Sequence, residues 1–249
     1  MNIWAIADLH LSFDTPGKEM SLFGPQWVDH PTKIAKFWDE HVAADDLVLI
    51  PGDISWAMRL EGAMKDLLWI DARPGTKVLL RGNHDYWWES ASKIKKALPK
   101  SLHIISNDAF LFHDVAVAGA RLWDSNEYSF SAFSTGPDVD SEKTGSREGA
   151  SPQDNEKIFQ RELHRLALSL QAMDPNARLK IAMTHYPPIG ADLAPSVASN
   201  MLEQAGVHIA IFGHLHALKP DSVLFGTGRG IQYHLVACDW LNFKLLKIN

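Results

Sequence analysis

The sequence predicts an α/β protein in which two mixed sheets pack face to face with helices on their outer sides. Over the first hundred residues, short apolar runs alternate with stretches of helical periodicity. Three apolar runs at 103–105, 109–112 and 115–118 then follow one another with almost no room for helices, which favours antiparallel pairing. Further on, the apolar runs 180–183 and 208–212 flank a helical segment.

The first half of the chain is expected to form three strand–helix units. Its strands are the apolar runs 2–7, 47–50 and 77–80. Its helices are expected around 34–42, 60–68 and 89–98, where apolar residues recur at intervals of three and four. Pro74 and Gly75 end the second helix because neither residue continues a helix well.

A polar segment at about 124–157 follows the closely spaced strands. It holds eight acidic and three basic side chains, which gives it a net charge of −5 out of −6 for the chain. It is rich in serine and glycine and longer than an ordinary connection, so we expect a lid or a mobile insertion in a single domain of residues 1–249. Pro152 marks the first turn of the next helix. Beyond it, a helix around 197–205 and two closing strands at 232–237 and 243–248 complete the pattern.

Composition excludes several classes of protein. A net charge of −6 lacks the basic excess that tight binding to phosphate backbones needs, so duplex nucleic acid is not an expected partner. The one cysteine, Cys238, excludes an intramolecular disulfide and fits a reducing compartment. Asp8 comes too early for a signal peptide, and no apolar run is long enough to span a bilayer. We therefore expect a cytoplasmic protein with no membrane partner, and the sequence leaves the oligomeric state open.

Residue types that bind metals follow five of the expected strands. In chain order they are Asp8-Leu9-His10, Gly52-Asp53, Gly82-Asn83-His84-Asp85, Thr184-His185 and Gly213-His214-Leu215-His216. Ligands of open α/β sheets bind outside the carboxyl ends of the strands, so we expect the five segments to meet at one rim. Residues i and i+2 of an extended segment point to the same side, which pairs Asp8 with His10 and His214 with His216.

Taken singly, each motif has a structural explanation. Gly-Asp is mostly a turn, and a lone Thr-His is usually a hydrogen-bonded core histidine. All five occur here in order, each behind an apolar run, and this joint occurrence indicates a metal site. Seven ligand-type side chains are too many for one ion and enough for two ions that share a carboxylate. Mixed carboxylate, amide and imidazole ligands suit Mn, Fe, Zn or Co.

From residue 8 to residue 216, this series resembles the calcineurin-like metallophosphoesterase superfamily. The resemblance implies a four-layer αββα sandwich with two divalent metal ions. It implies one ion held by Asp8, His10, Asp53 and His216, and a second held by Asp53, Asn83, His185 and His214. His84 would then lie beside the ions without binding them, and Asp85 would orient it. The sequence after Asp53 lacks the Asp-Arg-Gly motif of the protein serine/threonine phosphatases, so a phosphoprotein is not the expected substrate.

The expected activity is hydrolysis of a small anionic phosphate ester, either a monoester or a diester, of a small molecule or a nucleotide. The resemblance implies attack by a hydroxide that bridges the ions, with His84 protonating the leaving group. Arg121 and Arg59 are candidates for binding the phosphate, and Trp123 for stacking on the substrate. The alternative is a binding scaffold of the same fold with weak catalysis. That outcome normally goes with lost ligands, and none of the seven is lost here.

Overall fold

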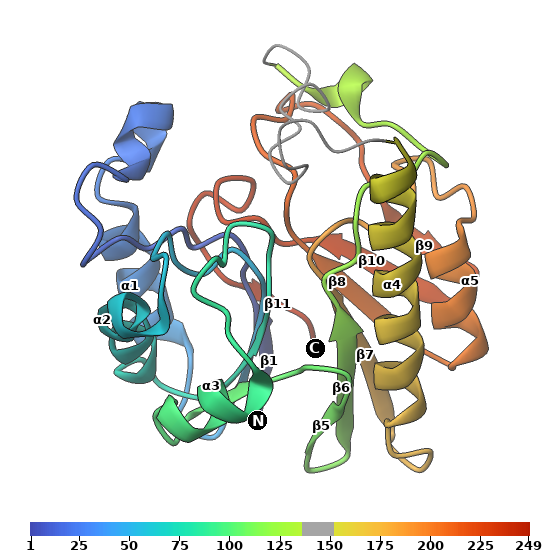
Figure 1. The fold of residues 1–249 in the computed structure, drawn as a ribbon, viewed down its shortest axis with the longest axis horizontal. Coiled ribbons are helices and arrows are strands. Elements are labelled where there is room, and N and C mark those ends of the chain that lie inside the picture. Colours follow the sequence, from blue (N-terminus) through green and yellow to red (C-terminus); the bar gives the residue numbers. More distant parts are fainter. Residues whose placement is uncertain (136–151) are drawn as a thin grey trace.

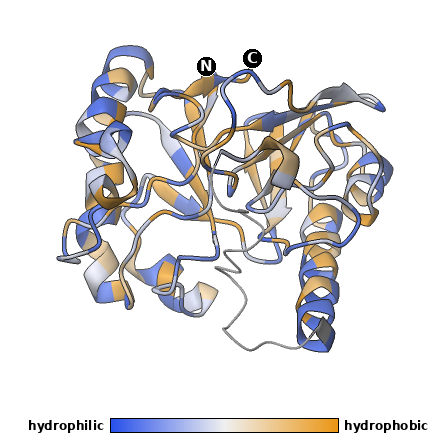
Figure 2. Cartoon of the chain, turned by 90° about the horizontal axis from the view of Figure 1, so that it is seen from above, coloured by the Kyte–Doolittle hydropathy of each residue, from blue (hydrophilic) through white to orange (hydrophobic). Residues whose placement is uncertain are grey.

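The computed structural model describes residues 1–135 and 152–249 and contains the two facing sheets that the sequence predicts. The layers run from helices through the first sheet and the second sheet to helices again (Figure 1). Seen from above, the strands in the middle are mostly apolar, and the helices on both flanks alternate apolar and polar residues (Figure 2). The predicted α/β sandwich with helices outside is therefore confirmed.

The first sheet has the strand order β11-β1-β2-β3-β4. Its parallel strands are β1 (Ile3–Ala5), β2 (Leu47–Pro51), β3 (Thr76–Leu80) and β4 (Leu102–Ile104), and the antiparallel edge strand is β11 (Leu246–Lys247). The helices on its outer face are α1 (His30–His41), α2 (Leu60–Asp71) and α3 (Ala91–Ala97). All five residues of β2 are buried, which explains why its sequence is a continuous apolar run.

The second sheet has the strand order β5-β6-β7-β8-β10-β9. Its strands are β5 (Ala109–Phe112), β6 (Val115–Ala120), β7 (Leu179–Thr184), β8 (Ile209–Phe212), β9 (Gly226–Gly228) and β10 (Ile231–Leu235). The inner four strands are parallel, and the edge strands β5 and β9 are antiparallel to their neighbours. The helices outside this sheet are α4 (Pro152–Gln171), which begins at the predicted proline, and α5 (Val197–Gln204).

One strand assignment from the sequence is wrong. The run at 103–105 was expected to pair antiparallel with its successors, but β4 joins the first sheet parallel to β3. The chain crosses between the sheets just after β4, through a turn in which Asn107 has a left-handed φ of 61°. Only β5 and β6 form the expected antiparallel pair. Apolar runs of this spacing look alike whether the turn between them stays in one sheet or changes sheets.

The sheets meet across a shared apolar core. Side chains of the first sheet such as Ile3 and Leu49 cluster with Val117, Ile181 and Ile211 of the second. Two further apolar clusters lie between each sheet and its own helices. Within residues 1–135 and 152–249, no helix has the length and hydropathy that a bilayer span requires.

The predicted insertion at 124–157 is described only at its two ends, because residues 136–151 lie outside the described part of the chain. Its first part lies against the second sheet's loops and contains the short 3-10 helix Ser131–Phe133. Two other short 3-10 helices in the described residues, Met20–Phe23 and Pro25–Trp27, precede α1. The Tyr128 hydroxyl donates to the Pro187 carbonyl at 2.6 Å, and the Thr135 amide donates to the Ala217 carbonyl at 2.8 Å. These contacts place the start of the insertion beside the segments that carry the predicted histidine ligands.

Candidate metal centre

The predicted ligands come together at the carboxyl ends of strands from both sheets. The first sheet supplies Asp8 and His10 after β1, Asp53 after β2 and Asn83 after β3, and the second supplies His185 after β7 and His214 and His216 after β8. All of them except His214 and His216 are buried, and these two are partly buried. The rim predicted from strand ends is therefore present, and it spans the line where the sheets face each other.

The first group of ligand atoms surrounds Asp8. One donor atom each of Asp8, His10 and His216 lies within 4.8 Å of the others. The Nε2 atom of His216 is 3.9 Å from Asp8 Oδ1, and the Nε2 atom of His10 is 3.7 Å from Asp53 Oδ2. These four side chains are the set expected to hold one ion.

The second group surrounds Asn83. Its Oδ1 atom lies 2.5 Å from His185 Nε2 and 3.1 Å from His214 Nδ1. The Nε2 atom of His185 is also 3.5 Å from Asp53 Oδ2. Asp53 thus faces both groups, as a bridging carboxylate must.

The protonation of His185 tests whether this second group fits a cation. Its Nδ1 atom is 3.1 Å from the Pro51 carbonyl, which only accepts, so Nδ1 carries the proton. Burial lowers the pKa of His185 well below its ordinary value, so the ring is neutral and Nε2 presents a lone pair. The atoms in front of that lone pair are Asn83 Oδ1 and Asp53 Oδ2, which are acceptors as well. Converging lone pairs of nitrogen and oxygen are what a bound divalent ion satisfies.

His216 is held in a matching way by a residue that sequence reasoning missed. Its Nδ1 atom donates to Asp239 Oδ1 at 2.9 Å, which leaves Nε2 directed at Asp8. This Nε2 atom is buried and has no hydrogen-bond partner among the described residues. A carboxylate that orients an imidazole in this manner fixes its tautomer and strengthens it as a ligand. Asp239 closely follows the apolar run 232–237, so the strand-end rule that found the other ligands could have found it.

The charges of the group also suit a cation. Burial raises the pKa of Asp8 to about 7 and that of Asp53 well above its ordinary value. Burial lowers the pKa of His214 to about 3, whereas for His216 the carboxylates of Asp239 and Asp8 outweigh burial and raise the pKa to about 10. A nearby divalent ion stabilises the anionic carboxylate and the neutral imidazole, and so offsets the burial of both carboxylates.

The backbone is strained where it presents these ligands. Asp8, His10, Asp53 and His214 have left-handed φ values of 59°, 44°, 51° and 72°. Non-glycine residues hold such angles at a cost of about 1–3 kcal/mol each, and only where the surroundings impose them. The strain turns each side chain out of its strand direction and toward the common centre.

Two glycines let the loops approach each other. A Cβ atom at Gly82 would overlap the carboxylate and the amide nitrogen of Asp53, and one at Gly213 would overlap the carboxylate of Asp8. The Gly-Asn and Gly-His motifs therefore need glycine for close packing. Any larger residue would displace a predicted ligand.

His84 lies beside the ligands, as the resemblance implies. Its amide donates to Asp53 Oδ1 at 2.8 Å, and its Nε2 atom is 3.9 Å from Asp53 Oδ2. The ring packs against Trp56, with ring centres 4.6 Å apart, and its side chain keeps 18% of its surface exposed. It therefore borders the centre and remains open to a substrate.

Asp85 does not do what was expected of it. Its buried carboxylate accepts hydrogen bonds from the amides of Ile54, Ser55 and Gly82 and from the indole of Trp87, at 2.8–3.2 Å. None of these donors is His84, so the prediction that Asp85 orients His84 is corrected. Asp85 instead joins the loop after β2 to the loop after β3, and so fixes the spacing between Asp53 and Asn83.

The predicted substrate-binding residues are placed unequally. Arg121 pairs with Glu162 at 3.3 Å and lies 4.6 Å over the ring of Trp123. Trp123 is only 4% exposed, so it offers little surface for stacking, in contrast to the prediction. Trp56 stacks on His10 with ring centres 5.0 Å apart, and Tyr186 packs on His214 with ring centres 3.9 Å apart. Arg59 is exposed at the start of α2.

The fold agrees with comparisons to known proteins. The family model described as calcineurin-like phosphoesterase matches residues 1–218. The chain belongs to the calcineurin-like phosphoesterase family. Its Asp and His clusters are candidate sites for metal ions.

Relatives of this phosphoesterase match in part or at low identity. The Gene 66 proteins of Mycobacterium phages D29 and L5 are 38% and 39% identical over 84 residues, which are 34% of this chain and 40% of each relative. The phosphopantetheinyl hydrolase of Mycobacterium tuberculosis is similar in structure, with a TM-score of 0.55 and 13% identity, over 99% of this chain and 95% of its own. That likeness shows a shared fold.

Proposed function

We propose that this phosphoesterase hydrolyses a small anionic phosphate ester with the help of two divalent ions, one in each ligand group. Asp8, His10, Asp53 and His216 would hold one ion, and Asp53, Asn83, His185 and His214 the other. The observation that carries the proposal is the neutral His185 ring, whose lone pair faces the oxygens of Asn83 and Asp53.

The ions and the protein would share the chemistry. Two bound divalent ions neutralise phosphoryl oxygens and activate water for in-line attack. The chain's own part is to fix the ligands, through the Asp239–His216 bond and the Pro51–His185 bond, and to bring His84 to the edge of the centre. His84 would donate a proton to the leaving oxygen, a role worth about 10²–10⁴ in rate.

The state of His84 before substrate binding bears on this role. Burial and the charges on His216 and Lys18 lower the pKa of the free His84 to about 4. A phosphate anion beside the ring favours the imidazolium and raises this pKa. We therefore infer that substrate binding and protonation of His84 are coupled.

His84→Ala tests the general-acid role. The variant is expected to retain both ions and to lose about 10²–10⁴ in kcat for alkyl phosphates, whose alkoxide leaves poorly without a proton. The loss should be smaller for nitrophenyl phosphate, whose phenolate leaves unprotonated. His164→Ala, an exposed histidine on α4, is the control. Equal losses for both esters would assign His84 to substrate binding, and a lost ion would make it a ligand.

The substrate class needs a direct screen. The Mn²⁺-loaded protein would be tested against an aryl monoester, an aryl diester, cyclic nucleotides and dinucleotides. Turnover of one of these identifies the ester type. Two bound ions with no turnover of any ester would favour the alternative, a binding scaffold.

A further inference from the structure

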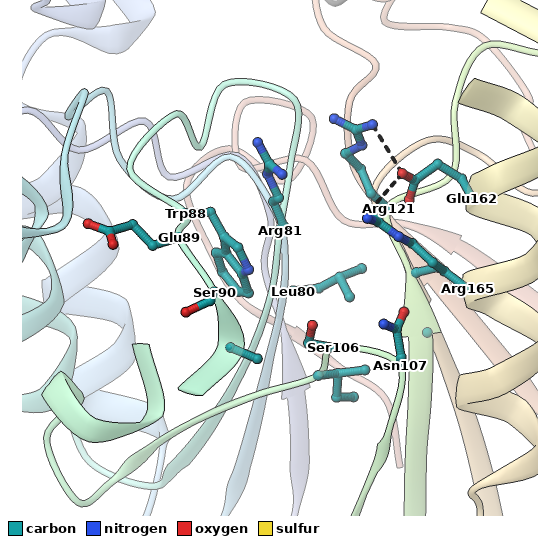
Figure 3. Close-up of a pocket in the computed structure, with 14 residues that line it drawn as sticks. Leu80, Arg81, Trp88, Glu89, Ser90, Ser106, Asn107, Arg121, Glu162 and Arg165 are labelled. Atoms are coloured by element: carbon teal, nitrogen blue, oxygen red, sulfur yellow. Dashed lines mark hydrogen bonds and ion pairs between the residues drawn. The ribbon is translucent and has the colours of Figure 1, made fainter. Parts of the chain in front are cut away.

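A pocket of about 220 Å³ lies beside the metal centre, between the ends of β3 and β6 and the middle of α4 (Figure 3). Three arginines line it, and each comes from a different element. Arg81 follows β3, Arg121 follows β6, and Arg165 lies on α4. Figure 3 shows their side chains around the same opening, with Glu162 next to Arg121 and Arg165.

The acidic groups of the pocket do not balance these arginines. Glu162 is 1% exposed, and its Oε1 atom contacts Arg121 at 3.3 Å, Arg165 at 2.9 Å and Arg161 at 3.5 Å. One carboxylate therefore serves three guanidinium groups. The other acid of the lining, Glu89, pairs with Lys93 at 2.5 Å. The pocket keeps a net positive charge.

Two of the guanidinium groups also have unused donors. The Nε atoms of Arg81 and Arg121 are buried and find no hydrogen-bond partner within the described residues. Buried donors without acceptors are costly, and such pairs of them are uncommon in a folded chain. Burial, with the positive charge of Arg121 and Arg165 adding to it, lowers the pKa of Arg81. An anion between the arginines would accept these hydrogen bonds and relieve the repulsion.

The pocket adjoins the ligands of one predicted ion. Arg81 precedes Asn83 by two residues in the loop that Asp85 holds. The carbonyl of Arg121 accepts hydrogen bonds from the amides of His185 at 3.1 Å and Tyr186 at 3.0 Å. A molecule whose phosphate ester lies at the metal centre thus has this pocket beside it.

We propose that the pocket formed by Arg81, Arg121 and Arg165 binds a second anionic group of the substrate, a phosphate or a carboxylate that is not itself hydrolysed. Arginine forks match the paired oxygens of both groups. The inference rests on the proposed function, because it makes the substrate a phosphate ester that carries another anion. The pocket itself can be tested without turnover.

Sulfate binding to the full chain is the first test, measured by calorimetry with and without Mn²⁺. Arg81→Gln and Arg165→Gln are each expected to weaken binding about tenfold or more, as for the loss of a charge-assisted hydrogen bond. Arg161→Gln is the matched control, because Arg161 contacts the same Glu162 but does not line the pocket. The Arg165 side chain is 41% exposed, so this variant should fold even if Arg81→Gln does not. Equal sulfate affinity in the wild type and the Arg165 variant would overturn the proposal.

A substrate series is the second test. The Mn²⁺-loaded enzyme would be given alkanediol bisphosphates and ω-carboxyalkyl phosphates of increasing chain length, each beside the ω-hydroxyalkyl phosphate of the same length. A second anion should raise kcat/KM about tenfold at a favoured length, and Arg81→Gln should abolish that gain while Arg161→Gln keeps it. A gain with the bisphosphates alone identifies the anion as phosphate, and a gain at no length overturns the proposal. If no ester in the series is turned over, the proposed function fails, and sulfate binding alone decides the pocket.

Discussion

Substitution of Asp239 is expected to weaken the binding of one metal ion while every predicted ligand stays in place. Its carboxylate accepts a hydrogen bond from the far nitrogen of His216, at 2.9 Å, and others from the backbone amides of Ala217 and Trp240, and its side chain is 13% exposed. Asp239→Asn keeps an acceptor oxygen but removes the charge, whereas Asp239→Ala removes the bond. A hydrogen bond to a charged group is worth about 1.5–3 kcal/mol and a neutral one about 0.5–1.5 kcal/mol. The asparagine variant should therefore bind one ion about tenfold more weakly, and the alanine variant about a hundredfold.

Competition with a chromogenic chelator during Mn²⁺ or Zn²⁺ titration measures both affinities. The wild type should bind two ions per chain, and each variant should bind one ion normally, because Asn83, His185 and His214 do not contact Asp239. Asp221→Asn, a change of an exposed carboxylate, is the control. Equal weakening of both ions, or no weakening in the alanine variant, would refute the reasoning that Asp239 acts through His216.

Three other predictions concern packing and burial. Gly82→Ala should lose metal, since the new methyl group displaces the Asp53 carboxylate. Gly62→Ala in α2 is the control, because its methyl group makes only ordinary contacts and should raise the unfolding free energy by about 0.5–1 kcal/mol. Elemental analysis and urea unfolding check both variants, and normal metal content in Gly82→Ala would contradict the overlap. Asp85→Asn removes the charge and turns one oxygen into an amide nitrogen, which would face either the Gly82 amide or the three donors to Oδ1, so urea unfolding should show a loss of roughly 3 kcal/mol, and a loss below 1 kcal/mol would count against its joining role. Burial lowers the pKa of Lys77 to about 8, so unfolding takes up a proton between pH 8 and 10.5; stability should rise with pH over that window, by up to roughly 3 kcal/mol relative to Lys77→Met, and parallel pH curves would exclude the shift.

The ligands could be predicted from the sequence because strand ends determine their position. A buried strand reads as an apolar run, and the polar residue after it reaches the rim whichever sheet the strand joins. This is why the assignment of β4 was wrong while the positions of Asp53 and Asn83 after their strands were as expected. The position of each ligand at the rim therefore depends only on the strand that directly precedes it in the chain.

The partners of these residues depend on contacts between distant segments, which the sequence does not show. His216 meets Asp239 across 23 residues, and Arg121 meets Glu162 across 41. The burial of Trp123 likewise involves packing against Tyr186, which lies 63 residues further along the chain and 5.4 Å away between ring centres. A role that is assigned because two residues are neighbours in the sequence, such as that of Asp85 toward His84, is therefore easily wrong.

The division of the ligands between the two sheets gives the metals a mechanical role. The first sheet ends in Asp8, Asp53 and Asn83, and the second in His185 and His214, so bound ions would cross-link the two halves of the molecule at their open rim. Metal binding then stabilises the contact between the sheets, by about 2.7 kcal/mol for a site when the free metal concentration is a hundred times its dissociation constant. Chelation should let the rim part before the apolar core opens. A core substitution between the sheets that tilts one sheet against the other would first change the metal affinity.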